Sequence, residues 1–149
     1  MDQSITILPA QISHADAVYS LMCQLEGPGF DRGAFLQVYA ANLEEDSIRY
    51  FLAFLDGKPV GFISMHAQRL LHHAGLVGEI QELVVQEGLR GRGIGRILFR
   101  AARDAACALG LMQLEVCCRR EREHSHAFYQ RMGMASSHYK LCLSLLEDA

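Results

Sequence analysis

The sequence predicts a single α/β domain spanning residues 1–149, with three layers and a central mixed sheet flanked by helices. Short apolar runs typical of strands alternate along the chain with longer segments of helical periodicity. The run that ends at Val85 is separated from the run that begins at Leu111 by one helix, and such a crossover joins parallel strands. A hairpin signal at Asp56-Gly57 joins antiparallel strands, so the sheet should contain both directions.

The first third of the chain should hold one strand and two helices. Ser13 can cap the first helix, because its hydroxyl can accept a hydrogen bond from a free helical N–H, and Asp31 can cap the second. Gly27-Pro28-Gly29 separates the two helices. The elements expected here are the strand Ser4–Leu8, a helix from Ser13 to about Glu26 and a helix from Asp31 to about Glu44.

The remaining elements follow from turns and periodicity. Asp56-Gly57 and His72-His73-Ala74-Gly75 are turns between strands. The apolar positions from Ile94 to Leu109 follow the helical period, and Gly110 ends that helix. The expected elements are the strands Ile48–Leu55, Val60–Leu70, Leu76–Val85, Leu111–Cys118 and His138–Leu145, with helices at Gly93–Leu109 and Glu123–Met132.

The most informative segment is Leu83–Gly95, where an apolar run passes through a basic, glycine-rich turn into a helix. Glycines lack a Cβ and leave the backbone N–H groups uncovered. At a helix N-terminus those unpaired donors and the positive end of the dipole favour an anion. Three arginines surround the same turn. The turn is therefore predicted to bind a phosphate or pyrophosphate, and its residues are Arg90, Gly91, Arg92, Gly93, Ile94, Gly95 and Arg96.

Two common nucleotide-binding motifs fit this turn poorly. A phosphate-binding loop of the GxxxxGK[ST] type needs Lys and then Ser or Thr after its last glycine, and Gly95 is followed by Arg96 and Ile97. The dinucleotide fingerprint GxGxxG fails at Arg96, although Glu115 lies about where a ribose-binding acid would fall, so a dinucleotide domain stays as an alternative. A plain turn without a ligand is a second alternative.

Composition excludes several classes of protein. Half of the residues are hydrophobic and 21% are charged, which indicates a folded domain. A net charge of -3 argues against a nucleic-acid partner. The segment MDQSITILPA lacks the features of a signal peptide, and no apolar run approaches a membrane span, so we expect no membrane partner. Five cysteines without metal-ligand spacing indicate reduced thiols and a cytoplasmic location.

The motifs together resemble the GNAT superfamily of N-acetyltransferases. Arg90, Gly93 and Gly95 match its acetyl-CoA motif [QR]xxGxG, and Glu79–Val85 resembles its central strand. Ala127-Phe128-Tyr129 and Gly133 resemble its FYxxxGF element, with Met134 in place of Phe. The resemblance covers nearly the whole chain and implies the acyl-CoA N-acyltransferase fold with acetyl-CoA as co-substrate. It also implies that Leu83, Val84, Val85 and Ser125 join the turn and Tyr129 in binding the coenzyme.

Acetyl transfer to an amine needs a group that removes a proton from the ammonium, donors for the oxyanion and a proton for the leaving thiolate. Alternation along the strand puts Glu79 and Gln81 on one side and Glu82 on the other. Glu79 is the first candidate for the base, directly or through water, and Glu82 is the second. Their alternatives are a solvated edge charge and a salt bridge. Tyr129 matches the family position that protonates the thiolate, and its alternative is a core aromatic. The oxyanion is assigned to backbone N–H groups near Val84 and Val85.

Further stretches resemble the aminoalkylphosphonate N-acetyltransferases: AVYSLMCQLE, FDRGAF, NLEEDSIRY, LHHAGLVGEIQELVV and HAFY. This resemblance implies a small aminoalkylphosphonate acceptor, a role in phosphonate utilisation or detoxification, and a divalent metal requirement whose ligands are unknown. A phosphonate needs Arg, Lys or His donors or a cation. The candidates for binding the acceptor are Arg49, Arg69, His72, His73, Gln81 and His126, with surface loop residues as the alternative for the histidines.

Rival functions fit parts of the same sequence. A protein N-acetyltransferase would need an open groove for a peptide, and a dinucleotide enzyme would prefer NAD to acetyl-CoA. A non-catalytic acyl-CoA sensor would bind the coenzyme without turnover. We expect the protein to form a homodimer.

Overall fold

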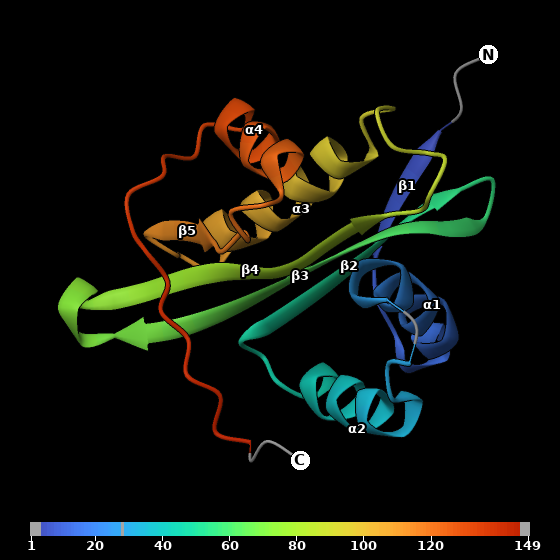
Figure 1. The fold of residues 1–149 in the computed structure, drawn as a ribbon, viewed down its shortest axis with the longest axis horizontal. Helices are drawn as coiled ribbons and strands as arrows, with labels where there is room; N and C mark the ends of the chain where they lie inside the picture. The colour runs from blue at the N-terminus through green and yellow to red at the C-terminus, as the bar shows by residue number, and fades with distance from the viewer. Residues whose placement is uncertain (1–3, 28, 147–149) are drawn as a thin grey trace. The chain divides into compact units, whose positions relative to one another are not determined.

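The structure is a computed structural model that describes residues 4–27 and 29–146. It divides into two compact units, Met1–Val116 and Cys117–Ala149 (Figure 1). The single domain of residues 1–149 stays a prediction.

The N-terminal unit is built on a mixed sheet. In the described residues the sheet has five strands in the order β1-β2-β3-β4-β5. Neighbours from β1 to β4 are antiparallel, and β4 pairs with β5 in parallel. This confirms the mixed sheet and the α/β class. The strands are β1 Ile5–Pro9, β2 Ile48–Leu55, β3 Lys58–Leu70, β4 Gly75–Val85 and β5 Gln113–Val116.

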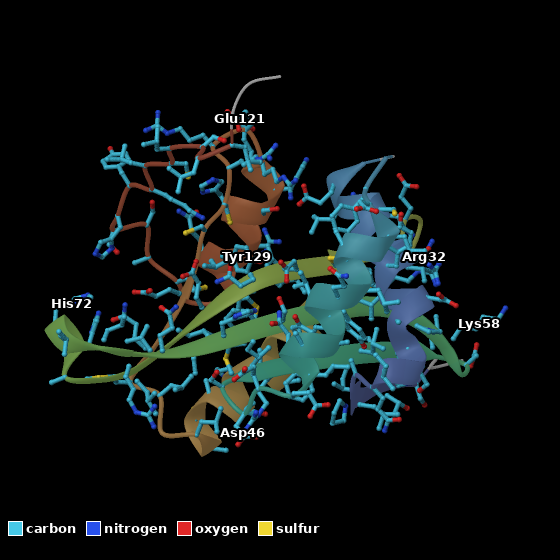
Figure 2. All side chains as sticks on the ribbon, turned by 90° about the horizontal axis from the view of Figure 1, so that it is seen from below. Arg32, Asp46, Lys58, His72, Glu121 and Tyr129 are labelled. Carbon is cyan, nitrogen blue, oxygen red and sulfur yellow. The ribbon has the colours of Figure 1, made fainter. Side chains whose placement is uncertain are left out.

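Helices cover both faces of this sheet. Successive residues of a strand point to opposite faces. A Cβ on Gly61 of β3 would lie 2.8 Å from Leu98 Cδ1 of α3, whereas the next residue, Phe62, belongs to the core cluster of Val18 and Tyr39. Helix α3 therefore packs on one face, and α1 and α2 pack on the other, where Figure 2 shows them side by side. The helices of this unit are α1 Ala15–Glu26, α2 Arg32–Leu43 and α3 Ile94–Ala108, with short 3-10 turns at Ile12–His14 and Leu71–His73.

Two of the predicted local signals are confirmed and one is wrong. Asp56 and Gly57 have φ of 50° and 77°, as a tight hairpin turn between β2 and β3 requires. Asp31 caps α2, because its Oδ1 accepts from the N–H of Gly33 at 3.2 Å. Ser13 is not the cap of α1. It lies inside the 3-10 turn Ile12–His14, through which the chain enters the helix.

The C-terminal unit contains the helix α4 Glu123–Arg131, as predicted. The predicted last strand, His138–Leu145, is wrong: residues 135–145 have no regular secondary structure. The alternating side chains that suggested a strand, such as Leu141 and Leu143, are 94% and 85% exposed. Alternation specifies which face each side chain would take, but a strand also needs a partner strand for its backbone groups.

Candidate active site

The glycine-rich turn leads from β4 directly into α3. Gly91 and Gly93 have φ of 83° and 82°, a left-handed region that favours glycine. Gly93 is the N-cap, and its carbonyl accepts from the N–H of Ile97 at 3.1 Å. Ile94 is buried and fixes the start of the helix against the core. The predicted anion site therefore lies at a true helix N-terminus, although Gly95 is inside the helix and not in the turn.

Positively charged side chains surround the start of α3, as predicted. Two arginines precede α3 and one lies in its first turn, and all three are exposed, so their guanidinium groups are available to an anion in solvent. They are Arg90, Arg92 and Arg96.

The end of β4 has an open edge beside the turn. In the described residues the parallel ladder with β5 runs from Val77↔Gln113 to Ile80↔Val116 and stops there. On its other edge β4 stays paired with β3 as far as Val85. In the described residues, the edge of Leu83–Val85 that faces away from β3 therefore has no strand partner.

A glutamine of α1 holds the segment that joins β4 to the glycine-rich turn. Gln24 Nε2 donates to Gln86 Oε1 at 3.0 Å, and the N–H of Glu87 donates to Gln24 Oε1 at 3.0 Å. Gln24 could not be identified from the sequence, because a contact across more than sixty residues leaves no local pattern.

A β-bulge changes the face on which one glutamate lies. The register between β3 and β4 passes from Ser64↔Glu82 to Met65↔Ile80, which leaves Gln81 as an extra residue on β4. Simple alternation predicts that Glu82 faces away from both Glu79 and Gln81, and this prediction is wrong. Glu79 and Glu82 pair with His66 and Ser64, which lie on one face of β3. The side chains of Gln81 and Glu82 line one cavity.

Ser64 holds Glu82 by two hydrogen bonds. Its hydroxyl donates to Glu82 Oε1, and its Oγ accepts from the Glu82 N–H at 2.9 Å. Ser64 is fully buried, so this pair is shielded from water on the β3 side. The bond from the Ser64 hydroxyl engages one carboxylate oxygen of Glu82, Oε1.

The cavity lies between α1 and α2 and the strands β2, β3 and β4, and has a volume of about 480 Å³. Met22 lines it from α1, the helix whose Gln24 holds the turn, so α1 contacts both the cavity and the turn. The cavity walls are largely aromatic: Phe30, Phe35, Tyr39, Tyr50 and Phe62. Its polar groups are Asp31, Asn42, His66, Gln81 and Glu82. None of the described residues that line it is Lys or Arg.

The two tyrosines of the cavity remain neutral phenols at physiological pH. Burial raises the pKa of Tyr39 to about 12, and its hydroxyl donates to the carbonyl of Gln11 at 2.7 Å. Burial also raises the pKa of Tyr50, the charge of Glu82 adds to that rise, and the bond from Asn42 opposes it. Asn42 Nδ2 donates to the Tyr50 oxygen at 2.7 Å, so the Tyr50 O–H is left to act as a donor.

Only some of the residues predicted to bind the acceptor line this cavity. Gln81 lines the cavity, whereas Arg49, Arg69, His72 and His73 do not. The Arg49 guanidinium donates to the carbonyls of Asp46 and Ile48, and His72 lies at the tip of the β3–β4 hairpin (Figure 2). His66, which the sequence analysis missed, lines the cavity in their place.

Glu79, the first candidate for the base, lies elsewhere on β4. Its backbone is in register with His66 of β3 and with Glu115 of β5. It is not among the residues that line the cavity, although its register with His66 puts it on the same face of the sheet as Glu82.

The C-terminal unit carries the remaining candidates on α4. Burial raises the pKa of Tyr129, the neighbouring Cys118 adds to the rise, and Arg122 opposes it. Its phenol therefore stays protonated at neutral pH. His126 Nε2 lies 3.0 Å from the carbonyl oxygen of Arg119, and Ser125 precedes it on the helix.

The described residues do not fit a divalent metal. No three His, Cys, Asp or Glu side chains gather in them as a ligand set. Within the same residues, no helix has the length and apolarity needed to cross a bilayer.

Comparison with known proteins gives one family. The model of the acetyltransferase (GNAT) family matches residues 15–134. An aminoalkylphosphonate N-acetyltransferase of Salmonella typhimurium is 40% identical over 136 residues, which are 91% of this chain and 88% of that protein. An uncharacterised N-acetyltransferase of Methanocaldococcus jannaschii is 32% identical over 61% of this chain and 41% of that protein.

Solved structures share the fold. An aminoglycoside N-acetyltransferase in complex with CoA has a TM-score of 0.88 at 20% identity, covering 97% of this chain and 96% of that chain. A glucosamine-6-phosphate N-acetyltransferase from Arabidopsis thaliana has a TM-score of 0.81 at 19% identity, covering 96% and 99%.

Proposed function

Because the chain belongs to the GNAT family and is an acetyl-CoA-dependent N-acetyltransferase, we propose that its acceptor is the primary amine of a small aminoalkylphosphonate. The observation that carries this proposal is the 40% identity, over 91% of the chain, to an aminoalkylphosphonate N-acetyltransferase. Aminomethylphosphonate and the aminoethylphosphonates are the proposed substrates, in phosphonate utilisation or detoxification.

The coenzyme is proposed to bind along β4 and the turn. Its pyrophosphate would accept from the N–H groups at the start of α3, where the helix dipole and the arginines also favour negative charge. Its pantetheine arm would pair with the open edge of Leu83–Val85, where the ladder with β5 has ended. In this pose the thioester would lie toward the bulge at Gln81 and Glu82.

The proposed base is Glu82. The acceptor arrives as an ammonium, and its nitrogen can attack only after it loses a proton. Glu82 lines the cavity and is held by Ser64, so it is aimed by the fold before the substrate binds. The freed amine then attacks the thioester carbonyl directly, and N–H groups near Val84 and Val85 stabilise the oxyanion.

The leaving thiolate needs a proton, and Tyr129 is proposed to supply it. This role rests on the match of Phe128-Tyr129 and Gly133 to the family element. The raised pKa of Tyr129 supports the proposal, because the phenol remains protonated at the pH of the reaction.

The phosphonate is proposed to bind neutral donors and a histidine. The side chains of His66 and Gln81 and the O–H of Tyr50 all belong to the cavity and can each donate to a phosphonate oxygen. They replace the arginines that the sequence analysis expected in this role.

A screen of acceptors tests the proposal. Release of free CoA thiol is followed with aminomethylphosphonate, 2-aminoethylphosphonate, spermidine and a short peptide at equal concentration. We expect the two aminophosphonates to give the highest kcat/KM. Equal turnover of spermidine would indicate a general amine acetyltransferase, and preference for the peptide would indicate a protein N-acetyltransferase.

A further inference from the structure

The tail, residues 135–146, exposes a row of large apolar side chains. From Tyr139 to Leu145 every second residue is apolar and at least 85% exposed. The exposed fractions are 86% for Tyr139, 94% for Leu141, 85% for Leu143 and 89% for Leu145, and Leu146 is also 85% exposed. Single apolar residues are common on protein surfaces, but a contiguous row of them marks an interaction site.

The spacing of this row indicates what can cover it. Successive residues of an extended chain point to opposite sides, so the apolar row forms one side of the tail, and Lys140, Cys142 and Ser144 lie on the other. Such a segment pairs with the open edge of a sheet, because its backbone groups bond the edge strand while its apolar side extends one face of the sheet.

The sheet of the same chain has an open edge of the matching kind. In the described residues β5 is the last strand of the sheet, so its side that faces away from β4 has no strand partner. Val116 of β5 pairs with Ile80 of β4, which is 2% exposed, whereas Leu114 and Val116 are only half-buried. The apolar face of the sheet therefore continues to this edge and is incompletely covered there.

The polar sides of β5 and of the tail carry opposite charges. Glu115 lies between Leu114 and Val116 in the strand and so points to the other face of the sheet. If the tail lies beside β5 with its apolar row next to Leu114 and Val116, Lys140 comes to the face of Glu115. The tail and the edge are thus complementary in both apolar pattern and charge.

A second copy of this chain is the partner that fits. Each copy has one exposed tail and one open edge, so two copies related by a twofold axis satisfy both by a reciprocal exchange. A stable interface buries roughly 1,200–2,000 Å² in total. The large apolar side chains of two tails supply roughly 800–1,500 Å² of that area before the surface that covers them is counted, so the exchange reaches this size.

We propose that the chain forms a homodimer by exchanging tails, so that each tail adds a sixth strand to the β5 edge of the other copy. This proposal does not depend on the proposed acceptor or on the catalytic groups. It accounts for the strand pattern of His138–Leu145, since the partner strand that this pattern needs belongs to the second copy.

The mass of the full chain in solution tests the exchange, measured by light scattering during size-exclusion chromatography. We expect a dimer at micromolar concentration, and a monomer would overturn the inference. Leu141→Lys should fold normally, because Leu141 is 94% exposed in a single copy. We expect it to raise the dissociation constant of the dimer about 100-fold or more, since each dimer loses two buried leucines.

Ser144→Lys is the matched control, because it puts the same charge on the polar side of the tail. We expect this variant to stay dimeric. Equal weakening of the dimer by Leu141→Lys and Ser144→Lys would show that the apolar row does not lie in the interface, and would overturn the inference.

A cross-link between copies identifies the edge that each tail contacts. Isotope-labelled and unlabelled copies are mixed by dilution and reconcentration, and a carbodiimide then joins lysine amines to neighbouring carboxyl groups. We expect a cross-linked peptide pair with Lys140 from one kind of copy and Glu115 from the other, and none in Lys140→Arg, which keeps the charge. Cross-links confined to one kind of copy would place the tail on its own chain, and a dimer without this cross-link would place it on another surface. Either result would overturn the inference.

Discussion

Replacing Ser64 by Ala should slow the chemical step without weakening coenzyme binding. The substitution removes one buried oxygen that makes both bonds to Glu82, one to Oε1 and one from the N–H at 2.9 Å. Ser64 is 0% exposed, so water cannot easily replace the lost hydroxyl. Glu82 would then rotate more freely and point toward the amine for less of the time.

The size of the effect follows from these bonds. A hydrogen bond to a charged group contributes about 1.5–3 kcal/mol. If most of this positions Glu82 in the transition state, kcat for the amine falls by roughly 10- to 100-fold, at about 1.4 kcal/mol for each factor of ten. Leaving the Glu82 N–H without its acceptor should also lower stability by about 1–3 kcal/mol.

The assay is a steady-state measurement of CoA thiol release at saturating amine and at saturating acetyl-CoA, together with thermal unfolding. Ser20→Ala is the control, because Ser20 is an exposed residue of α1. We expect kcat to fall while KM for acetyl-CoA is unchanged, because Ser64 contacts Glu82 and not the proposed coenzyme site. A drop in stability with unchanged kcat would refute a positioning role for Ser64.

Three further substitutions test other parts of the site. Gly93→Ala forces a side chain into a left-handed backbone conformation, which costs about 1–2 kcal/mol. We expect KM for acetyl-CoA to rise far more than KM for the amine. Equal changes in the two KM values would argue against a phosphate site at this turn. Tyr129→Phe should lower kcat by ~10²–10⁴-fold, and a nearly normal kcat would make Tyr129 a structural aromatic. Gln24→Ala removes both bonds to the turn and should weaken acetyl-CoA binding measured by titration; unchanged affinity would show that the turn holds its shape without Gln24.

The parts of the fold that follow from local signals could be predicted from the sequence. The Asp56-Gly57 hairpin, the Asp31 cap and the glycine turn before α3 each depend on a few adjacent residues. The strand expected at His138–Leu145 failed for the opposite reason, because pairing depends on a distant partner that alternation does not supply.

The site itself depends on contacts between distant segments. The bulge at Gln81 arises from the register of two strands, so simple alternation put Glu82 on the wrong face. Ser64 and His66 carry no motif and become visible only once β3 lies beside β4. Arg49 and Arg69 are predicted to bind the acceptor because a phosphonate favours arginine, and neither lies among the described residues that line the cavity.

The pH dependence of kcat/KM for 2-aminoethylphosphonate in Glu82→Gln and Glu79→Gln tests the central claim most directly. Glutamine keeps the shape of each side chain but cannot accept the proton. We expect Glu82→Gln to lose ~10²–10⁴-fold at neutral pH and to recover partly at high pH, where free amine is abundant, and Glu79→Gln to stay within a few-fold of the parent. The opposite pattern, with the loss and the recovery in Glu79→Gln, would contradict the assignment of Glu82 as the base.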